Sequence, residues 1–264
     1  MIDAVASQDG HRARPWLAGL VPLLLVIAWL FATSITGRFL PHQLPSPGQV
    51  WATAWQLGGD GELARHVLAS VGRVLAGFAL GASLAIALGT LVGLSRTAEA
   101  LVDPTLQIAR NVPSLAWVPF LLLWMGIDEA PKITLIAIGA AFPVYLNLVA
   151  GIRQTDPALI EVGRIFGLGR VGLVCRIFLP SAFPYLLAGL RIAIGQSWLF
   201  LVAAELIAST RGLGFLLIDG ENTARPNIMV VGIVMLALLG KLSDTALRIA
   251  ARRIVRWSDG AATR

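Results

Sequence analysis

Cysteine and histidine are nearly absent from this chain of 264 residues. Cys175 is the single cysteine, so the chain has no internal disulfide and no metal site built from several thiolates. The three histidines, His11, His42 and His66, are too far apart for the spacing by which one helix presents two ligands to an ion. We therefore expect no metal in this chain.

Charge is scarce as well. Only 14% of the residues are charged, 56% are hydrophobic, and the mean hydropathy is +0.76, which is typical of an integral membrane protein. The apolar runs have roughly the 17–25 residues that cross about 30 Å of hydrocarbon, and they are apolar on every side instead of alternating as in a β-barrel. We predict an all-α integral membrane protein with about six transmembrane helices, at 15–37, 74–95, 111–127, 133–152, 185–208 and 227–243.

Lysine and arginine are unevenly distributed between the segments that join these runs. With a cytoplasmic N-terminus, the cytoplasmic segments hold most of them, including five arginines after residue 247, as the positive-inside rule requires. This predicts a cytoplasmic tail at 1–14, a transmembrane domain at 15–247 and a basic cytoplasmic tail at 248–264. The rule also accounts for the net charge of +6, so we expect no nucleic-acid partner. The first run exceeds the roughly 7–15 apolar residues of a cleaved signal peptide, which predicts a retained anchor.

Small residues recur at every fourth position of the second run, at Gly77, Gly81, Ala85, Gly89 and Gly93. Such a stripe lets two helix backbones approach closely in lipid, where no hydrophobic drive brings helices together. We predict that this stripe is a helix–helix interface.

Proline and polar side chains gather in the third and fourth runs, at Asn111, Pro113, Ser114, Pro119, Pro143 and Asn147. A proline inside a helix frees a carbonyl, which a membrane tolerates only where protein or water satisfies it. Two interpretations are open. These runs either pack against other helices or line a water-filled path.

The segment 155–180 interrupts the apolar pattern. Asp156 before Pro157 predicts a helix start, and Gly167 or Gly169 predicts its end. The helix is too short to cross a bilayer, and its apolar side runs through Leu159, Val162 and Phe166, with Glu161 and Arg164 elsewhere. One interpretation is an amphipathic helix on the membrane surface.

The spacing within this segment favours a different interpretation. Glu161, Gly167, Ile177, Leu179 and Pro180 occupy five of the seven defined positions of a known loop pattern without a gap. The segment thus resembles the EAA loop of permeases from binding-protein-dependent ABC importers. Val162 and Gly163 stand where that family has alanines. The stretches NVPSLAWVPFLLLWMG, AAFPVYLNLVAGIRQTDP and AELIASTRGLGFLL are similar to the sulfonate, taurine and nitrate group, particularly to aliphatic sulfonate permeases.

The resemblance implies that the short helix couples the membrane domain to a separate ATPase subunit dimer that binds ATP and magnesium. The coupling residues would be Glu161, Val162, Gly163, Gly167, Ile177, Leu179 and Pro180. The chain itself is expected to be no enzyme, because it lacks a P-loop. Its only Gly-Lys pair, Gly240 and Lys241, is followed by Leu242 instead of serine or threonine.

The resemblance also implies a bacterial inner-membrane protein with a second permease copy, in the simplest case a homodimer. A periplasmic or lipid-anchored solute-binding protein would deliver the solute, a small organic oxyanion such as an aliphatic sulfonate or taurine. An anion needs hydrogen-bond donors along its path. By their position within the runs, the candidates are Asn111, Ser114, Asn147, Gln196 and Ser197.

Two other functions compete with this interpretation. A secondary, ion-coupled transporter needs ionisable relays deep in the membrane, and the candidate is Glu205 near an external end. We expect Glu205 to pair instead with an arginine of the external loop. A membrane scaffold that transports nothing would leave the proline and asparagine placements without a purpose.

Overall fold

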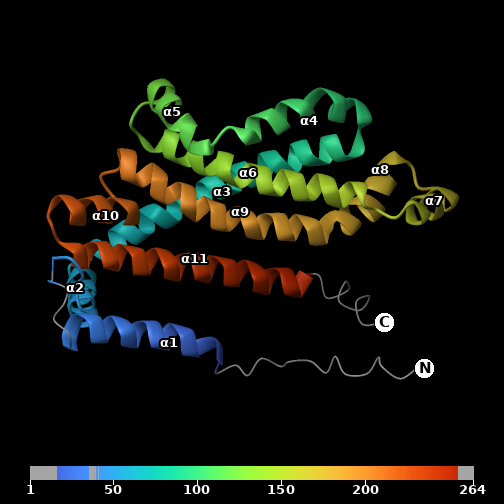
Figure 1. Cartoon of the computed structure of the whole chain (residues 1–264). Coiled ribbons are helices and arrows are strands. Elements are labelled where there is room, and N and C mark those ends of the chain that lie inside the picture. The colour runs from blue at the N-terminus through green and yellow to red at the C-terminus, as the bar shows by residue number, and fades with distance from the viewer. Residues whose placement is uncertain (1–16, 36–39, 41, 255–264) are drawn as a thin grey trace, which may run out of the picture.

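The computed structural model describes residues 17–35, 40 and 42–254, and every regular element in these ranges is helical. The predicted all-α class is confirmed. The predicted tail at 1–14 and residues 255–264 lie outside the described residues. The elements in Figure 1 are α1 (Leu17–Leu30), η1 (Phe31–Ile35), α2 (Pro47–Gly59), α3 (Glu62–Leu94), α4 (Arg96–Asn111), η2 (Ser114–Trp117), α5 (Val118–Met125), α6 (Glu129–Arg153), α7 (Pro157–Ile165), α8 (Arg170–Leu173), η3 (Val174–Phe178), α9 (Leu179–Ala208), α10 (Leu213–Asn222) and α11 (Pro226–Ile254).

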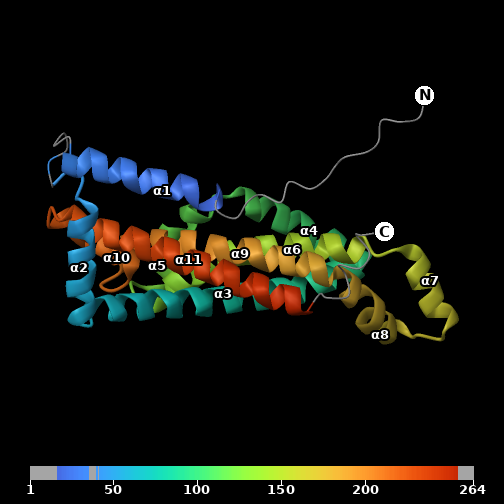
Figure 2. The same cartoon turned by 90° about the horizontal axis from the view of Figure 1, so that it is seen from below.

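The core of the bundle consists of α3, α6 and α9, which lie side by side (Figures 1 and 2). The small-residue stripe of α3 faces α6. A Cβ atom on Gly81 would lie 2.2 Å from the Ala137 carbonyl oxygen, and one on Gly77 would lie 2.6 Å from the Ile136 Cβ. The two backbones therefore touch at a distance that only glycine permits, and the predicted interface is confirmed.

The packing of α9 on α6 uses the same device. A Cβ on Gly189 of α9 would lie 2.9 Å from the Pro143 carbonyl oxygen, and one on Gly139 of α6 would overlap the ring of Phe200. The residues that α3, α6 and α9 contribute to this core are buried and apolar, among them Val74, Ile136, Ile194 and Leu201. The three helices thus form one tightly packed unit.

The other helices surround this unit. α10 packs against α11 and α9, and α2 crosses one end of the bundle against α11 and α3. α1 runs beside α11 but apart from the core (Figures 1 and 2), and its leucine and valine side chains from Leu20 to Leu30 are exposed.

The third predicted span is wrong as a single helix. Residues 111–127 are divided between the end of α4, η2 and α5, and the axis bends by 92° between Arg96–Asn111 and Ser114–Met125. The cause is local. Pro113 disfavours the helical conformation of the residue before it, and Val112 accordingly adopts an extended backbone with φ −74° and ψ 120°. Pro119 then occupies the first turn of α5, where its missing N–H costs nothing.

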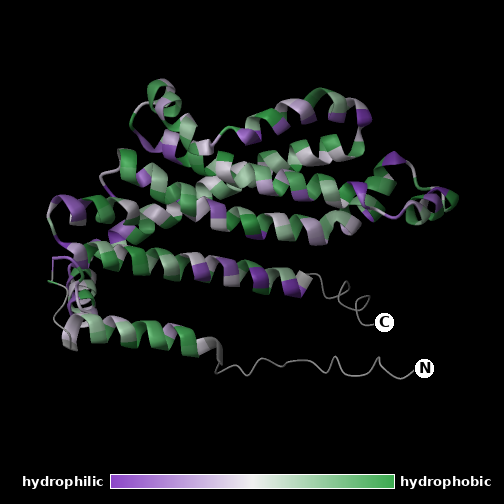
Figure 3. Ribbon diagram, viewed as in Figure 1, coloured by the Kyte–Doolittle hydropathy of each residue, from purple (hydrophilic) through white to green (hydrophobic). Residues whose placement is uncertain are grey.

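Four helices are long and apolar enough to cross a membrane: Glu62–Leu94, Glu129–Arg153, Arg170–Ile207 and Pro226–Arg253. They contain the second, fourth, fifth and sixth predicted runs. The bent pair of α4 with η2 and α5 brings the number to five, and Gly19–Ser34 is a shorter apolar helix. A count of six spans stays a prediction. Hydrophilic residues gather near α10, near α7 and α8, and in the second half of α11 (Figure 3), so both ends of the bundle are polar.

Candidate functional site

The short helix α7 has a defined start and a defined end. The Asp156 carboxylate accepts a hydrogen bond from the Ala158 N–H at 2.9 Å, and Pro157 is the first helical residue. At the other end Gly167 takes a φ of +76°, and the Leu168 N–H reaches back to the Gly163 carbonyl at 3.0 Å. This is the Schellman arrangement, in which a glycine closes the last turn. The predicted start and end of the helix are both confirmed.

Four large apolar side chains in and beside α7 are about half exposed or more within the described chain. α7 and α8 project from one end of the bundle, beyond α6 and α9 (Figures 1 and 2). Ile165 is 83% exposed and Phe166 is 81% exposed, while Leu159 and Val162 are about half exposed. A capped, rigid helix that holds a phenylalanine and an isoleucine in the open presents a surface suited to another protein.

α7 is in direct contact with the helix that enters the bundle. Gly163 is buried, and a Cβ on it would lie 2.4 Å from Ile177 Cδ1 and 2.8 Å from Leu173 Cδ2. α8, η3 and α9 are continuous, so Arg170–Ile207 form one helical rod of 38 residues. The π-helical turn η3 precedes Pro180, which has no N–H to donate to the turn before it. Gly163 of α7 thus lies directly against Leu173 and Ile177 at the start of this rod.

The other predicted coupling residues lie on the surface of α7 or at the start of α9. Glu161 is exposed and makes no ion pair with any residue that the structure describes. Leu179 and Pro180 form the first turn of α9. The helix after the glycine turn begins at Arg170, ahead of the predicted fifth span at 185–208.

A groove of about 580 Å³ opens along one side of the bundle. Four of the five predicted path residues line it: Asn111, Ser114, Asn147 and Gln196. They come from α4, η2, α6 and α9, so the groove collects polar side chains that are up to 85 positions apart in the sequence. The Asn147 side-chain amide also donates to the Pro143 carbonyl at 2.8 Å, within the groove wall.

Ser197 is the exception among the predicted path residues. It is fully buried, and its hydroxyl donates to the Ala193 carbonyl of the preceding turn at 2.9 Å. Sequence reasoning also missed a residue of the groove. Arg110, an exposed side chain in the last turn of α4, lines it beside Asn111. Arg110 immediately precedes the predicted third span, where its charge marks only the start of that span. An arginine beside a predicted path residue, Asn111, is the feature that could have identified it.

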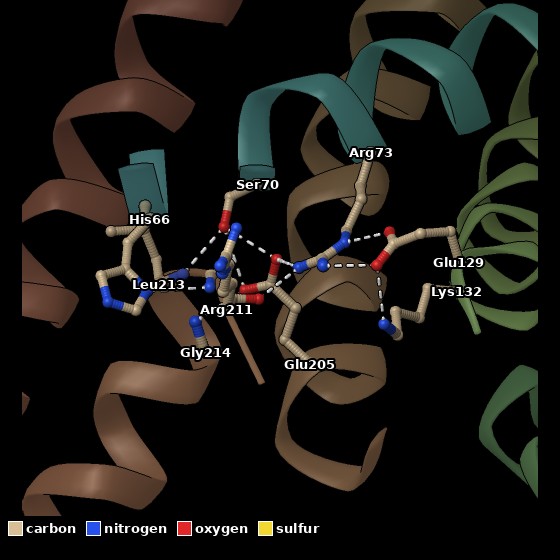
Figure 4. A network of polar contacts seen from close by, with 10 residues as sticks. His66, Ser70, Arg73, Glu129, Lys132, Glu205, Arg211, Leu213 and Gly214 are labelled. Carbon is tan, nitrogen blue, oxygen red and sulfur yellow. Dashed lines mark hydrogen bonds and ion pairs between the residues drawn. The ribbon is translucent and has the colours of Figure 1, made fainter. Parts of the chain in front are cut away.

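A second polar centre lies at the end of the bundle opposite α7 (Figure 4). The Arg73 guanidinium makes a bidentate pair with Glu129 at 2.6 and 2.7 Å. Its remaining Nη1 donates to Glu205 Oε1 at 2.7 Å and to the Arg211 carbonyl at 2.5 Å. Lys132 Nζ lies 2.9 Å from Glu129. Two cations therefore balance two carboxylates.

The Glu205 carboxylate is surrounded by donors. Besides Arg73, it accepts hydrogen bonds from the Ser70 hydroxyl at 2.8 Å and the Gly214 N–H at 2.7 Å. Gly212 adopts a φ of +133°, and a Cβ there would overlap this carboxylate, so only glycine fits. The cluster ties α3, α6 and α9 to the turn that leads into α10.

Glu205 thus pairs with an arginine, but not with one of the external loop. Its partner is Arg73 within α3, and Arg211 contributes only a backbone carbonyl to the cluster. A carboxylate that is 1% exposed and held by three hydrogen-bond donors has a structural role. Within the described residues, no three histidine, cysteine or acidic side chains are grouped so that they would hold a metal ion.

A helical bundle with apolar helices long enough to cross a membrane, a polar groove at mid-length and an exposed capped helix at one end has the features expected of a membrane transport subunit. The chain belongs to the family described as "Binding-protein-dependent transport system inner membrane component", which it matches over residues 67–256. It is therefore a permease subunit of an ABC transporter.

Several named relatives cover almost the whole chain. It is 40% identical over 247 residues to SsuC of Escherichia coli (strain K12), with 94% of this chain and 92% of that protein covered. It is 38% identical to SsuC of Bacillus subtilis (strain 168), covering 97% and 92%. Both carry the name of an aliphatic sulfonates transport permease protein. The taurine transport system permease protein TauC of Escherichia coli (strain K12) is 34% identical, covering 90% and 88%.

The fold itself has a counterpart among solved structures. A chain of the MetNI methionine ABC transporter in an inward-facing conformation superposes with a TM-score of 0.55 at 22% identity, over 76% of this chain and 96% of that chain. The secondary transporter considered from the sequence is thereby excluded, since both the family and the fold are those of ABC permeases.

Proposed function

We propose that this chain forms the translocation path of an ATP-driven importer for a small organic oxyanion, an aliphatic sulfonate or a taurine-like solute. The names of its relatives support the solute class. The groove supports the path, because Asn111, Ser114, Asn147 and Gln196 present amide and hydroxyl donors there. A groove that offers hydrogen-bond donors and has no carboxylate among its described lining residues suits an anionic solute, because it attracts the anion and does not repel it.

The single observation that carries the proposal is the geometry of α7. Its exposed Ile165 and Phe166 form the surface that a separate ATPase subunit covers. That subunit, as a dimer, binds ATP and magnesium and performs the hydrolysis, so this chain is no enzyme. Glu161, Val162, Gly163, Gly167, Ile177, Leu179 and Pro180 are the coupling residues, within a coupling segment at 155–180.

Mechanical transmission follows from the packing. When the ATPases close, they move α7 as a unit, because its two ends are capped. The buried Gly163 presses on Ile177, which belongs to the helical rod that continues into α9. Since α9 is packed on α6 and α6 on α3, the three helices move together and change which side of the membrane the groove faces.

The groove is open along one side, so a second copy of the chain is proposed to close it as a homodimer. A periplasmic or lipid-anchored solute-binding protein delivers the solute at the end that carries α2 and α10. The protein lies in a bacterial inner membrane with both termini in the cytoplasm. We propose a tail at 1–14, a transmembrane permease domain at 15–247 and a basic tail at 248–264.

The test is a charge placed on the exposed apolar surface of α7. Phe166→Asp should reduce co-purification of the ATPase and ATP-driven uptake of a labelled alkyl sulfonate by at least about tenfold, because a carboxylate would be buried without a partner. The matched control is Trp55→Asp on α2, an equally exposed aromatic residue at the opposite end of the bundle. It should leave ATPase co-purification unchanged.

Two results would contradict the proposal. Normal uptake by Phe166→Asp would mean that α7 is no docking surface. Loss of the ATPase in both variants would mean that the aspartates act through the fold, and thermal unfolding of each purified variant identifies that case.

A further inference from the structure

We infer that Arg110 is the residue that selects anions in the groove, holding the sulfonate group of the solute by its guanidinium. The inference rests on the proposed function, in that the groove is taken as part of the path. It adds a charged binding residue to a site otherwise described by neutral donors.

Arg110 lies beside the middle of the long helices α6 and α9. The groove is lined by Gly139, Pro143 and Asn147 of α6 and by Gln196 of α9. α6 extends over Glu129–Arg153 and α9 over Leu179–Ala208, so these residues lie at mid-length of both helices. A charge beside the middle of two membrane helices is costly unless it faces a water-filled cavity, and such charges mark ion pathways.

The second observation concerns the partners of Arg110. Among the described residues, no carboxylate lies within ion-pair distance of its guanidinium, whereas Arg73, Arg153 and Arg191 each have an acidic partner. Asp103 attracts the Arg110 charge only at longer range. The acidic residue nearest in sequence on the same helix is Asp103. Its carboxylate already accepts hydrogen bonds from the Tyr145 hydroxyl at 2.6 Å and from Gln107 at 2.7 Å. Asp103 does not line the groove.

The described groove residues therefore carry one positive charge and no negative charge. Arg110 is the single ionisable side chain among the described residues that line it. A guanidinium offers five N–H donors in a planar fork, which matches two oxygens of a sulfonate as it matches those of a carboxylate or phosphate. The neighbouring Asn111, Ser114 and Gln196 supply neutral donors for the remaining oxygen.

The break between α4 and η2 explains why the arginine reaches the groove. The axis bends by 92° across Val112 and Pro113, and this leaves irregular backbone beside the middle of α6 (Figure 1). Irregular backbone at membrane depth occurs where it lines a cavity. Arg110 belongs to the last turn of α4, is exposed and lines the groove.

The experiment measures the charge preference of the groove directly. In a Cys175→Ser background, Leu146→Cys places a thiol on an exposed groove position. The full transporter in permeabilised membranes is treated with two thiol reagents of similar size, the anionic sulfonatoethyl methanethiosulfonate and the cationic trimethylammonioethyl methanethiosulfonate. Each reacts with the cysteine thiolate to form a mixed disulfide and release methanesulfinate. The quantity compared is the ratio of the two rates.

Arg110→Gln should lower the anion-to-cation rate ratio at Leu146→Cys by about tenfold or more, and Arg110→Lys should retain most of it, because the effect is electrostatic. Arg96→Gln removes the same charge from the first turn of the same helix and should leave the ratio unchanged. The second control is a chain that keeps native Cys175 and Leu146, in which the only thiol is exposed outside the groove. Its ratio should not respond to Arg110→Gln.

An unchanged ratio in Arg110→Gln would overturn the inference, and so would a Leu146→Cys thiol that neither reagent reaches, since the groove would then hold no water. Sulfonate uptake by the unmodified chain is measured in the same cells. A chain that imports no sulfonate contradicts the proposed solute, while the labelling ratio still decides the role of Arg110. Normal uptake with an unchanged ratio rejects Arg110 alone.

Discussion

At the scale of single residues, Arg73 and Glu205 can be buried as charged side chains because Arg73 pairs with both Glu205 and Glu129. Arg73 is 7% exposed and Glu205 is 1% exposed, and each has its hydrogen-bonding groups occupied by the other elements of the cluster. Such a buried pair contributes little net stability compared with an apolar replacement of both partners. Removing one partner is different, because it leaves the other charge buried and alone.

We therefore expect Arg73→Met to lower the free energy of unfolding by about 3–5 kcal/mol, because Glu205 loses its cation. Arg153→Met is the matched control. Its ion pair with Glu99 at 3.0 Å is exposed, and its loss should cost less than about 1 kcal/mol. Thermal unfolding of both variants in the same detergent measures the difference, and equal shifts would show that the cluster has no special role.

The same scale shows which site residues the sequence reveals. Asn111, Ser114, Asn147 and Gln196 are recognisable because polar side chains are rare in apolar runs, and the structure brings them into one groove. Ser197 satisfies the same criterion, yet it is buried in the bundle, where its hydroxyl is satisfied by the Ala193 carbonyl of the preceding turn. Composition cannot distinguish these two outcomes, because neighbouring positions of one helix point in different directions.

At the scale of elements, the close contact of α3 with α6 sets the architecture of the core. The interaction depends on the absence of side chains along one face of α3. Periodicity predicts that this face of α3 is a helix–helix interface, because a repeat of four residues follows one slowly rotating stripe of a helix. That the partner is α6 is seen only in the structure. The third span is the element that is predicted wrongly from the sequence. Its residues form one continuous apolar run, but Pro113 and Pro119 divide that run into separate helical pieces.

Gly81→Leu should separate α3 from α6 and lower the free energy of unfolding by about 3 kcal/mol, near the upper end of the cost of overpacking. The reason is the position of the Ala137 carbonyl, which is backbone and cannot move aside. Gly72→Leu is the control on the same helix, because nothing lies within 4 Å of a Cβ at that position. Should both variants unfold at the same temperature, the contact of α3 with α6 would carry no strain.

At the scale of the whole molecule, the two ends of the bundle have different roles. One end carries α7 and α8, and the other carries α2, α10 and the buried ionic cluster (Figures 1 and 4). The groove lies between them at mid-length of α6 and α9. An import cycle in which the ATPase acts at one end and the solute is delivered at the other follows from this separation under the proposed function.

The proposed orientation is tested with a membrane-impermeant thiol reagent. Native Cys175 on η3 should react in inside-out vesicles and not in right-side-out vesicles. Gly59→Cys, at the end of α2 where a Cβ meets no other atom, should show the reverse pattern in a Cys175→Ser background. Reaction of both thiols from one side would contradict the placement of α2 and α7 on opposite faces.

The sequence by itself determined the membrane class, the helical architecture, the helix–helix interface along the small-residue stripe of α3 and the capped ends of α7. Each of these depends on composition, on periodicity or on residues a few positions apart, such as Asp156 with Ala158 or Gly167 with Arg164. Only the tertiary structure decided that α6 packs on this stripe, that Arg73 is the partner of Glu205, and that Arg110 lines the groove with Gln196. These contacts join residues far apart in the chain, and their geometry is set by how closely the glycine-lined helices pack.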